Sequence, residues 1–239
     1  MKKFKQKRAL WYRGMKQIMK VRYKKPKFIF LGEAPAKGSI ILSNHEGTDA
    51  PMSLEIYCQF PIRMWGTNEM NSGLIKMYKY QTKVYYHQKK HWNLYAARLF
   101  CLLASPLTNL FYKGLKLIST YKDGRFKKTI NESFEAISNG ENIVIFPEKS
   151  PDGYKAELKD FYAGFLVFAQ YCFKKGIDTP IYVSYYKKKE KIYIFEKPIL
   201  FSKLKEMFET REKIIKYLLD KCNVLNNLDI SRYIEKNDK

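Results

Sequence analysis

The sequence has few cysteines and histidines, which limits the disulfide and metal chemistry that it can support. Its four cysteines lie far apart with no Cys-x-x-Cys pair, so we expect them to be ordinary core thiols of a reducing compartment. His87 and His91 have the i, i+4 spacing of a helical metal pair, but no carboxylate or cysteine stands beside them. We therefore expect solvated or interfacial histidines, and we expect no metal.

Long hydrophobic runs are also scarce. The longest uncharged apolar stretch, residues 99–112, is interrupted by Pro106 and is shorter than the roughly 20 residues that a membrane-spanning helix needs. At the amino terminus, only residues 9–12 separate two basic segments, which is too short for the apolar region of a secretory signal. These features predict an intracellular protein without a spanning helix.

Acidic residues are outnumbered by basic ones, with 23 Asp and Glu against 45 Lys and Arg and a formal net charge of +22. Such a charge favours an acidic partner, and three classes fit: nucleic acid, an anionic membrane surface, or an acidic protein such as acyl carrier protein. A composition rich in Lys, Asn and Tyr can also follow from the base composition of a genome. Charge alone leaves these alternatives open.

One segment brings two ionisable residues to the end of a buried strand. Residues 40–42 are a short apolar run between Gly38 and Asn44, His45 follows, and Asp49 opens a helix start before Pro51. We expect His45 and Asp49 to lie together at the carboxyl edge of a sheet. A neutral imidazole held by a carboxylate can take a proton from an alcohol. Alternatively, Asp49 is only a helix cap and His45 a turn residue.

A second segment, residues 142–153, is another strand that ends in Phe146-Pro147-Glu148 and a turn-rich loop. With Asn44-His45 and Asp49 about a hundred residues earlier, the chain resembles the glycerolipid acyltransferase family, typified by 1-acylglycerol-phosphate acyltransferases. Further blocks follow in the family's order, and the resemblance covers residues 28–201. It implies an α/β fold with a central, mostly parallel sheet flanked by helices on both faces.

The resemblance also implies an activity and a site. The enzyme would transfer a fatty acyl group from an acyl carrier protein or CoA thioester to a hydroxyl of a glycerolipid acceptor such as a lysophospholipid. His45 would be the base, Asp49 would orient it, and Glu148 would hold the acceptor. No covalent intermediate, metal or cofactor is implied, because the thioester is a co-substrate.

The chain departs from the family pattern at three points. Three residues separate His45 from Asp49 where the family has four, and the family's arginines after Phe-Pro-Glu and in its second block are missing. Lys122, Arg125, Lys149 or Lys155 could supply the lost charge for a phosphate, although a lysine is a point charge and not a bidentate fork. These departures keep open a catalytically divergent protein that binds membrane or nucleic acid on the same fold.

Two segments have the composition of a membrane-surface anchor. Residues 4–23 predict a basic amphipathic helix with an apolar face that could instead pack on the domain; the face comprises Leu10, Trp11, Met15, Ile18 and Met19. Residues 74–104, an insertion relative to the family, interleave aromatics with lysines, which suits a headgroup boundary or single-stranded nucleic acid. We favour the membrane and expect no nucleic acid, so the protein would lie in the cytoplasm, peripherally bound to the inner face of the cell membrane.

The remaining pattern predicts alternating helices and strands without repeats or a linker. Helices are expected at residues 128–139, 163–175 and 211–222, and strands at 143–146, 181–186 and 191–195. We divide the chain into an interfacial helix (1–26), an acyltransferase domain (27–205), and a carboxyl-terminal helix and tail (206–239), of which residues 235–239 are expected to fray.

Overall fold

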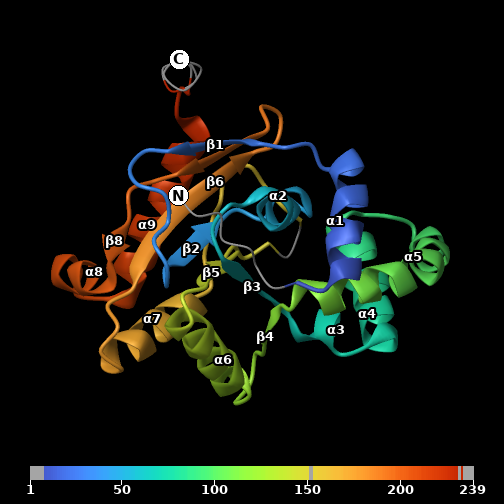
Figure 1. Ribbon diagram of the computed structural model, residues 1–239, viewed down its shortest axis with the longest axis horizontal. Coiled ribbons are helices and arrows are strands. Elements are labelled where there is room, and N and C mark those ends of the chain that lie inside the picture. The colour runs from blue at the N-terminus through green and yellow to red at the C-terminus, as the bar shows by residue number, and fades with distance from the viewer. Residues whose placement is uncertain (1–7, 151–152, 231–232, 234–239) are drawn as a thin grey trace.

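The computed structural model describes residues 8–150, 153–230 and 233, and within these residues eight strands form one central sheet (Figure 1). The expected tail at residues 235–239 lies outside the described residues. The strands are β1 (Lys27–Phe30), β2 (Ile40–Ser43), β3 (Ile62–Thr67), β4 (Ile118–Thr120), β5 (Asn142–Ile145), β6 (Pro180–Lys187), β7 (Ile192–Phe195) and β8 (Ile199–Leu200).

The sheet is mostly parallel, as the sequence predicts. Its order is β1-β7-β6-β2-β5-β3-β4, with β8 paired to β6. The run from β6 through β2, β5 and β3 to β4 is parallel, β1 is parallel to β7, and only the pairs β6–β7 and β6–β8 are antiparallel. The carboxyl ends of β2, β5 and β6 therefore meet at one edge of the sheet, where α/β proteins place their sites.

Helices cover both faces of the sheet. They are α1 (Leu10–Arg22), α2 (Asp49–Tyr57), α3 (Asn68–Asn71), α4 (Leu74–Tyr80), the π-helix η1 (Gln81–Lys89), α5 (Leu94–Leu115), α6 (Phe126–Ser138), α7 (Gly164–Lys174), α8 (Phe201–Met207) and α9 (Arg211–Asn227). Figure 1 shows α1, α3, α4 and α5 grouped on the right of the molecule, with α6 to α9 on the other side.

Alternation along the strands divides the core into two layers. In β2, Ile40 and Leu42 pack in one cluster with side chains of α6, α7 and α9, whereas Ile41 packs in the other with side chains of α1, α2 and α5. Successive strand residues point to opposite faces, so a strand that is apolar throughout is covered on both sides, as is usual in parallel sheets. All four cysteines are free thiols, and three of them are buried.

Several short elements were not expected from the sequence, among them β1, β4, β8 and α8. Each strand has two to four residues at the margin of the sheet, too few to set up a clear alternation. The expectation that Asp49 caps α2 is wrong by one residue. Thr48 is the cap, Asp49 is the first helical residue, and no side chain caps the helix.

Helix α5 corrects the expectation that no segment reaches the length of a membrane span. Pro106 lies inside the helix without ending it, and α5 runs for 22 residues with Arg98 and Lys113 as its only charges. By length and composition alone, α5 could cross a membrane. Of its most apolar part, 22% is buried inside the protein. Ala97, Cys101 and Ser105 face the protein, while a continuous apolar face is exposed: Tyr95, Leu99, Phe100, Leu102, Leu103, Leu107 and Leu110.

Helix α1 covers most of the expected amphipathic segment, of which residues 4–7 lie outside the described residues. Its expected apolar face is divided between two surroundings. Tyr12 is fully buried, and Met15 and Met19 pack against the same core cluster. By contrast, the other apolar side chains of α1 are exposed, and these are Leu10, Trp11, Ile18 and Val21.

Candidate active site

His45 follows β2 directly, and buried polar contacts fix the end of this strand. The side-chain amide of Asn44 accepts from the backbone N–H of Tyr186 at 2.7 Å and donates to the Tyr186 carbonyl at 3.1 Å, which ties β2 to β6. The chain then turns sharply into α2, with Glu46 and Gly47 in the left-handed region at φ 39° and 67°. The positive φ favours glycine at position 47, where a Cβ would stand 3.3 Å from Nζ at the flexible end of the Lys90 side chain.

The imidazole of His45 lies in a largely apolar setting. Its ring stacks on Tyr154 with 4.6 Å between centroids and lies 5.0 Å from the ring of Phe146. Its buried Nδ1 has no hydrogen-bond partner among the described residues. Burial, with the nearby charge of Lys89, lowers the pKa of His45 to about 4. The imidazole is therefore neutral at physiological pH.

Asp49 does not hold this imidazole, contrary to expectation. One carboxylate oxygen of Asp49 lies 3.0 Å from Lys188 Nζ and the other 3.7 Å from Arg22. The hydrogen bond from Lys188 to Asp49 raises the pKa of this lysine. Two cations from distant parts of the chain thus occupy the carboxylate, and the predicted imidazole–carboxylate pair is not formed between these described side chains.

Glu148 does approach His45, but through the backbone. Its Oε2 accepts the His45 backbone N–H at 2.8 Å, and the residue is buried beside a bridge to Phe161. Burial raises the pKa of Glu148, while this hydrogen bond and Lys89 oppose the rise. The structure therefore brings His45 and Glu148 together at the adjoining ends of β2 and β5.

The expected phosphate-binding cations have diverse surroundings. Lys149 Nζ lies 2.5 Å from Asp160, and Arg125 forms a two-pronged ion pair with Asp123. Lys122 is exposed and close enough to Lys89 to lower its pKa. Lysines 149, 155 and 159 line a cavity of about 250 Å³ next to Glu148. Of the expected cations, Lys149 and Lys155 therefore share a cavity wall with Glu148.

Residues of the insertion lie beside the site, although their composition predicts a membrane-surface segment and no role at the site. Lys89, the last residue of η1, lies 3.3 Å from Ser150 Oγ and 4.7 Å from the ring centroid of Tyr154. Partial burial lowers the pKa of Lys89. Lys90 reaches Gly47, as described above. The sequence signal that could have pointed to these residues was the Lys89-Lys90 pair between His87 and His91. Such a pair resembles an ordinary basic segment exposed to solvent.

No grouping of side chains suggests a resident metal in the part of the chain that the structure describes. There, no three or more His, Cys, Asp or Glu side chains are arranged to hold an ion. The imidazole of His87 contacts the carbonyl of Trp92 at 2.9 Å instead. The chemistry available at the site is that of a neutral imidazole, a buried carboxylate and several ammonium groups.

The similarity of this chain to known proteins is seen in its fold. No protein-family model and no curated protein sequence matches the chain. Among solved structures, it is similar to the crystal structure of the 1-acyl-sn-glycerophosphate (LPA) acyltransferase PlsC from Thermotoga maritima, with a TM-score of 0.50 and 13% sequence identity. The match covers 91% of this chain and 77% of that one. The chain thus has the fold of a glycerophosphate acyltransferase, which confirms the predicted resemblance and fold class.

Proposed function

We propose that the protein is an acyltransferase that moves a fatty acyl group from a thioester to a hydroxyl of a glycerolipid acceptor, such as a lysophospholipid. The observation that carries this proposal is the neutral, partly buried imidazole of His45, a residue whose backbone N–H is bound by Glu148 at the carboxyl edge of a parallel sheet. This arrangement stands on the fold of a known acyltransferase. Fold alone does not decide activity, so the argument depends on the site.

The proposed reaction is a direct transfer. Neutral His45 takes the proton of the acceptor hydroxyl while that oxygen attacks the thioester carbonyl carbon. The carbon–sulfur bond then breaks, and the departing thiolate takes up the proton from the imidazolium. The backbone amides of residues 46 and 47 are candidates to stabilise the oxyanion, because those of His45 and Lys149 already donate to Glu148 and Asp160.

The donor and acceptor are proposed by class. Acyl-acyl carrier protein and acyl-CoA are both anionic and suit the net charge of +22. For a phosphorylated acceptor, the candidate cations are Lys89, whose charge acts on both His45 and Glu148, and Lys149, which lines the cavity next to Glu148. Both substrates are consumed in the reaction, so the proposal needs no resident cofactor.

The protein would work at an anionic bilayer, on the cytoplasmic side. The exposed apolar face of α5 supports this location, because such a broad patch is unusual on a soluble monomer. Helix α5 also packs on η1, where Ser105 bonds to Gln81 and the partly exposed ring of Phe100 lies 5.1 Å from that of Tyr86. A helix held in this way suits a position in the bilayer surface rather than across it.

A direct test measures thiol release from acyl-CoA or acyl-acyl carrier protein with a lysophospholipid present. His45→Ala should lower the rate by about 100- to 10,000-fold, the usual contribution of a positioned base. His87→Ala is the matched control, since that side chain is exposed and bonds only to the Trp92 carbonyl. Full activity of His45→Ala would exclude the mechanism. Lipid analysis of cells that lack or overproduce the protein would identify the acceptor.

A second candidate is a catalytically divergent protein that binds membrane or nucleic acid. The ion pairs that occupy Asp49 favour it, because they leave His45 without an orienting carboxylate. Such a protein would release no thiol and would bind its partner equally well with His45→Ala. Its binding would instead fall steeply with salt.

A further inference from the structure

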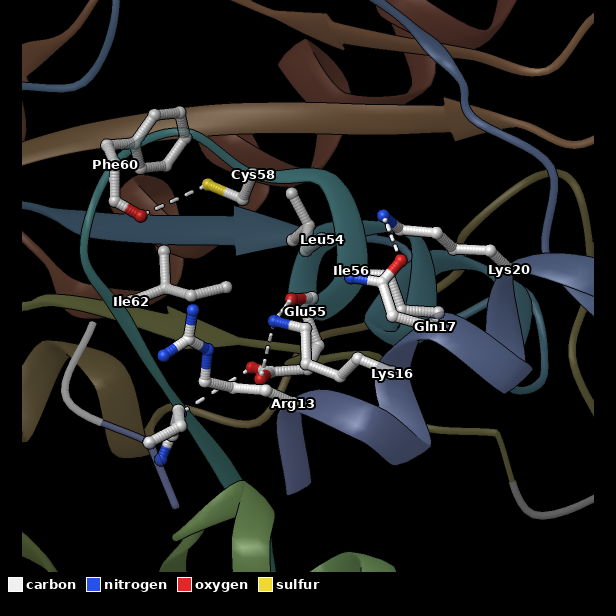
Figure 2. A pocket seen from close by; sticks show the side chains of 11 residues that line it. Arg13, Lys16, Gln17, Lys20, Leu54, Glu55, Ile56, Cys58, Phe60 and Ile62 are labelled. Atoms are coloured by element: carbon white, nitrogen blue, oxygen red, sulfur yellow. Dashed lines mark hydrogen bonds and ion pairs between the residues drawn. The ribbon is translucent and has the colours of Figure 1, made fainter. Parts of the chain in front are cut away.

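A second cavity, of about 230 Å³, lies between α1 and the segment that joins α2 to β3 (Figure 2). It is separate from the candidate active site at His45. Its wall includes Ile62, the first residue of β3, whereas His45 follows the last residue of β2. Because β2 and β3 are both parallel to β5, the cavity and the candidate active site lie at opposite edges of the sheet.

Four basic side chains line this cavity, and they face one carboxylate. That carboxylate, Glu55, is buried and already bound by the Tyr12 hydroxyl at 3.1 Å, Lys16 at 3.2 Å and Arg8 at 3.6 Å. These contacts hold α1 against α2. Buried carboxylates require such partners, and the charge of Glu55 is already shared between Arg8 and Lys16, while its Oε2 has no hydrogen-bond partner among the described residues.

The remaining cations have no acidic partner within the described residues. Lys20 donates only to the neutral side chain of Gln17, at 2.8 Å, and no ion pair involves Arg13. Arg8 is 6% exposed, and its Nε is buried in the cavity wall without a hydrogen-bond partner. Since a buried donor without a partner is unfavourable, the cavity is suited to an anion with several acceptor oxygens.

An apolar stripe on α1 lies next to these cations. Leu10, Ile18 and Val21 are exposed, and their positions in the helix place them on one face, beside the face that carries Arg13 and Lys20. Trp11 extends this stripe. A soluble anion would make no use of it, whereas a lipid offers a phosphate to the cations and acyl chains to the stripe.

We propose that this cavity binds the phosphate of an anionic phospholipid and so anchors the protein at a site separate from the one at His45. Arg13 can present a two-pronged donor to phosphate oxygens, Lys20 adds a point charge, and Leu10, Ile18 and Val21 enter the acyl region. The lipid bound here is an anchor and not the acyl acceptor. The inference does not require that the protein be an acyltransferase.

The test compares two double variants of the full chain that lose the same charge. Arg13→Ala/Lys20→Ala removes the unpaired cations of the cavity but keeps the Glu55 contacts that hold α1. Lys127→Ala/Lys128→Ala removes two exposed lysines of α6, on the other face of the sheet. Co-sedimentation with phosphatidylcholine vesicles, with and without phosphatidylglycerol, is measured in the absence of donor and acceptor, so failure of acyl transfer does not affect the result.

We expect the first variant to bind phosphatidylglycerol vesicles about tenfold or more weakly, and the control to change by less than about threefold. Equal loss in both variants would overturn the site in favour of attraction by net charge. Inorganic phosphate tests the other source of the same chemistry. If inorganic phosphate bound the unaltered protein but not Arg13→Ala/Lys20→Ala, while both proteins bound vesicles equally well, the lipid assignment would be wrong.

Discussion

The backbone N–H of His45 donates to Glu148 Oε2 at 2.8 Å and joins the ends of two neighbouring strands that are 103 residues apart in sequence. Through this bond, Glu148 after β5 can fix the position of His45 after β2 without contacting the imidazole. A charged acceptor of this kind contributes about 1.5 to 3 kcal/mol. Glu148 therefore positions the histidine in addition to any contact with an acceptor.

Replacement of Glu148 should separate these two roles. Glu148→Ala removes the acceptor of the His45 N–H and should lower the free energy of unfolding by about 1.5 to 3 kcal/mol as well as acyl transfer. Glu148→Gln keeps a carbonyl oxygen at that place, so it should keep most of the stability but still weaken acceptor binding or turnover. Urea unfolding and acceptor KM and kcat measure the two effects. Unchanged kinetics in Glu148→Gln would rule out a role with the acceptor.

The ion pair between Asp49 and Lys188 leads to a second prediction. If Asp49 acts by holding Lys188 and Arg22, then Lys188→Met should lower activity about as much as Asp49→Asn. If Asp49 instead turns to His45 during the reaction, Lys188→Met should leave activity unchanged or raise it, because it frees the carboxylate. If Asp49 turns to His45, Asp49→Asn should lower activity by orders of magnitude. We expect that Asp49 turns to His45, and the thiol-release rates of Lys188→Met and Asp49→Asn distinguish the two alternatives.

The exposed Lys189 offers a matched control for that experiment. It neighbours Lys188 in the turn after β6 and forms no ion pair among the described residues. Lys189→Met removes the same charge from the same turn without touching Asp49. Equal effects of Lys188→Met and Lys189→Met would assign the change to local charge rather than to the ion pair.

Sequence patterns predicted the parts of the site that depend on local signals. The apolar runs of β2 and β5, each followed by turn residues, place His45 and Glu148 at strand ends, and parallel pairing then brings them together. The partner of Asp49 has no such signal, because Lys188 is distant in sequence and lies in an ordinary lysine-rich turn. Only tertiary packing brings α2 to the end of β6.

The same limit applies to the insertion. Its aromatic and basic residues suggested a surface segment, but η1 folds back so that Lys89 lies beside Tyr154. A π-helix is rare and leaves no clear periodicity. Pro106 predicts an interruption, yet α5 continues through it, with Pro106 on the exposed side of the helix, where its ring displaces no packed side chain. The π-helix and the continuation of α5 through Pro106 depend on the surroundings of each helix. The periodicity of apolar residues in the sequence carries no information about those surroundings.

The lowered pKa of His45 predicts how stability changes with pH. The unfolded chain binds a proton on this residue near pH 6.5 and the folded chain near pH 4, so between these values the unfolded state holds more protons. Stability should therefore fall as the pH drops through this window, by up to about 3 kcal/mol from His45. Chemical unfolding at pH 7 and pH 4.5 measures the fall, and His45→Gln should reduce it. An identical fall in His45→Gln would place the titration on another group.

The last prediction concerns which helix holds the protein on the bilayer. Leu99, Leu103 and Leu107 lie on the exposed face of α5 and make no part of the two core clusters, so changes to serine should leave the fold intact. Each buried leucine contributes about 1.5 to 3 kcal/mol to partition into an apolar phase. Leu99→Ser/Leu103→Ser should therefore weaken binding to anionic vesicles by at least about tenfold, even at high salt, because the lost term is apolar.

Trp11→Ser/Ile18→Ser makes the corresponding change on α1, and Val224→Ser serves as a control on α9, where an exposed apolar side chain stands alone. Weakening by both double variants, without an effect of the control, would mean that α1 and α5 enter the bilayer together. Their contact at Gly114, where Tyr12 and Trp11 leave no room for a Cβ, supports this result. If only the α1 variant lost binding, the exposed face of α5 would have to meet something other than lipid.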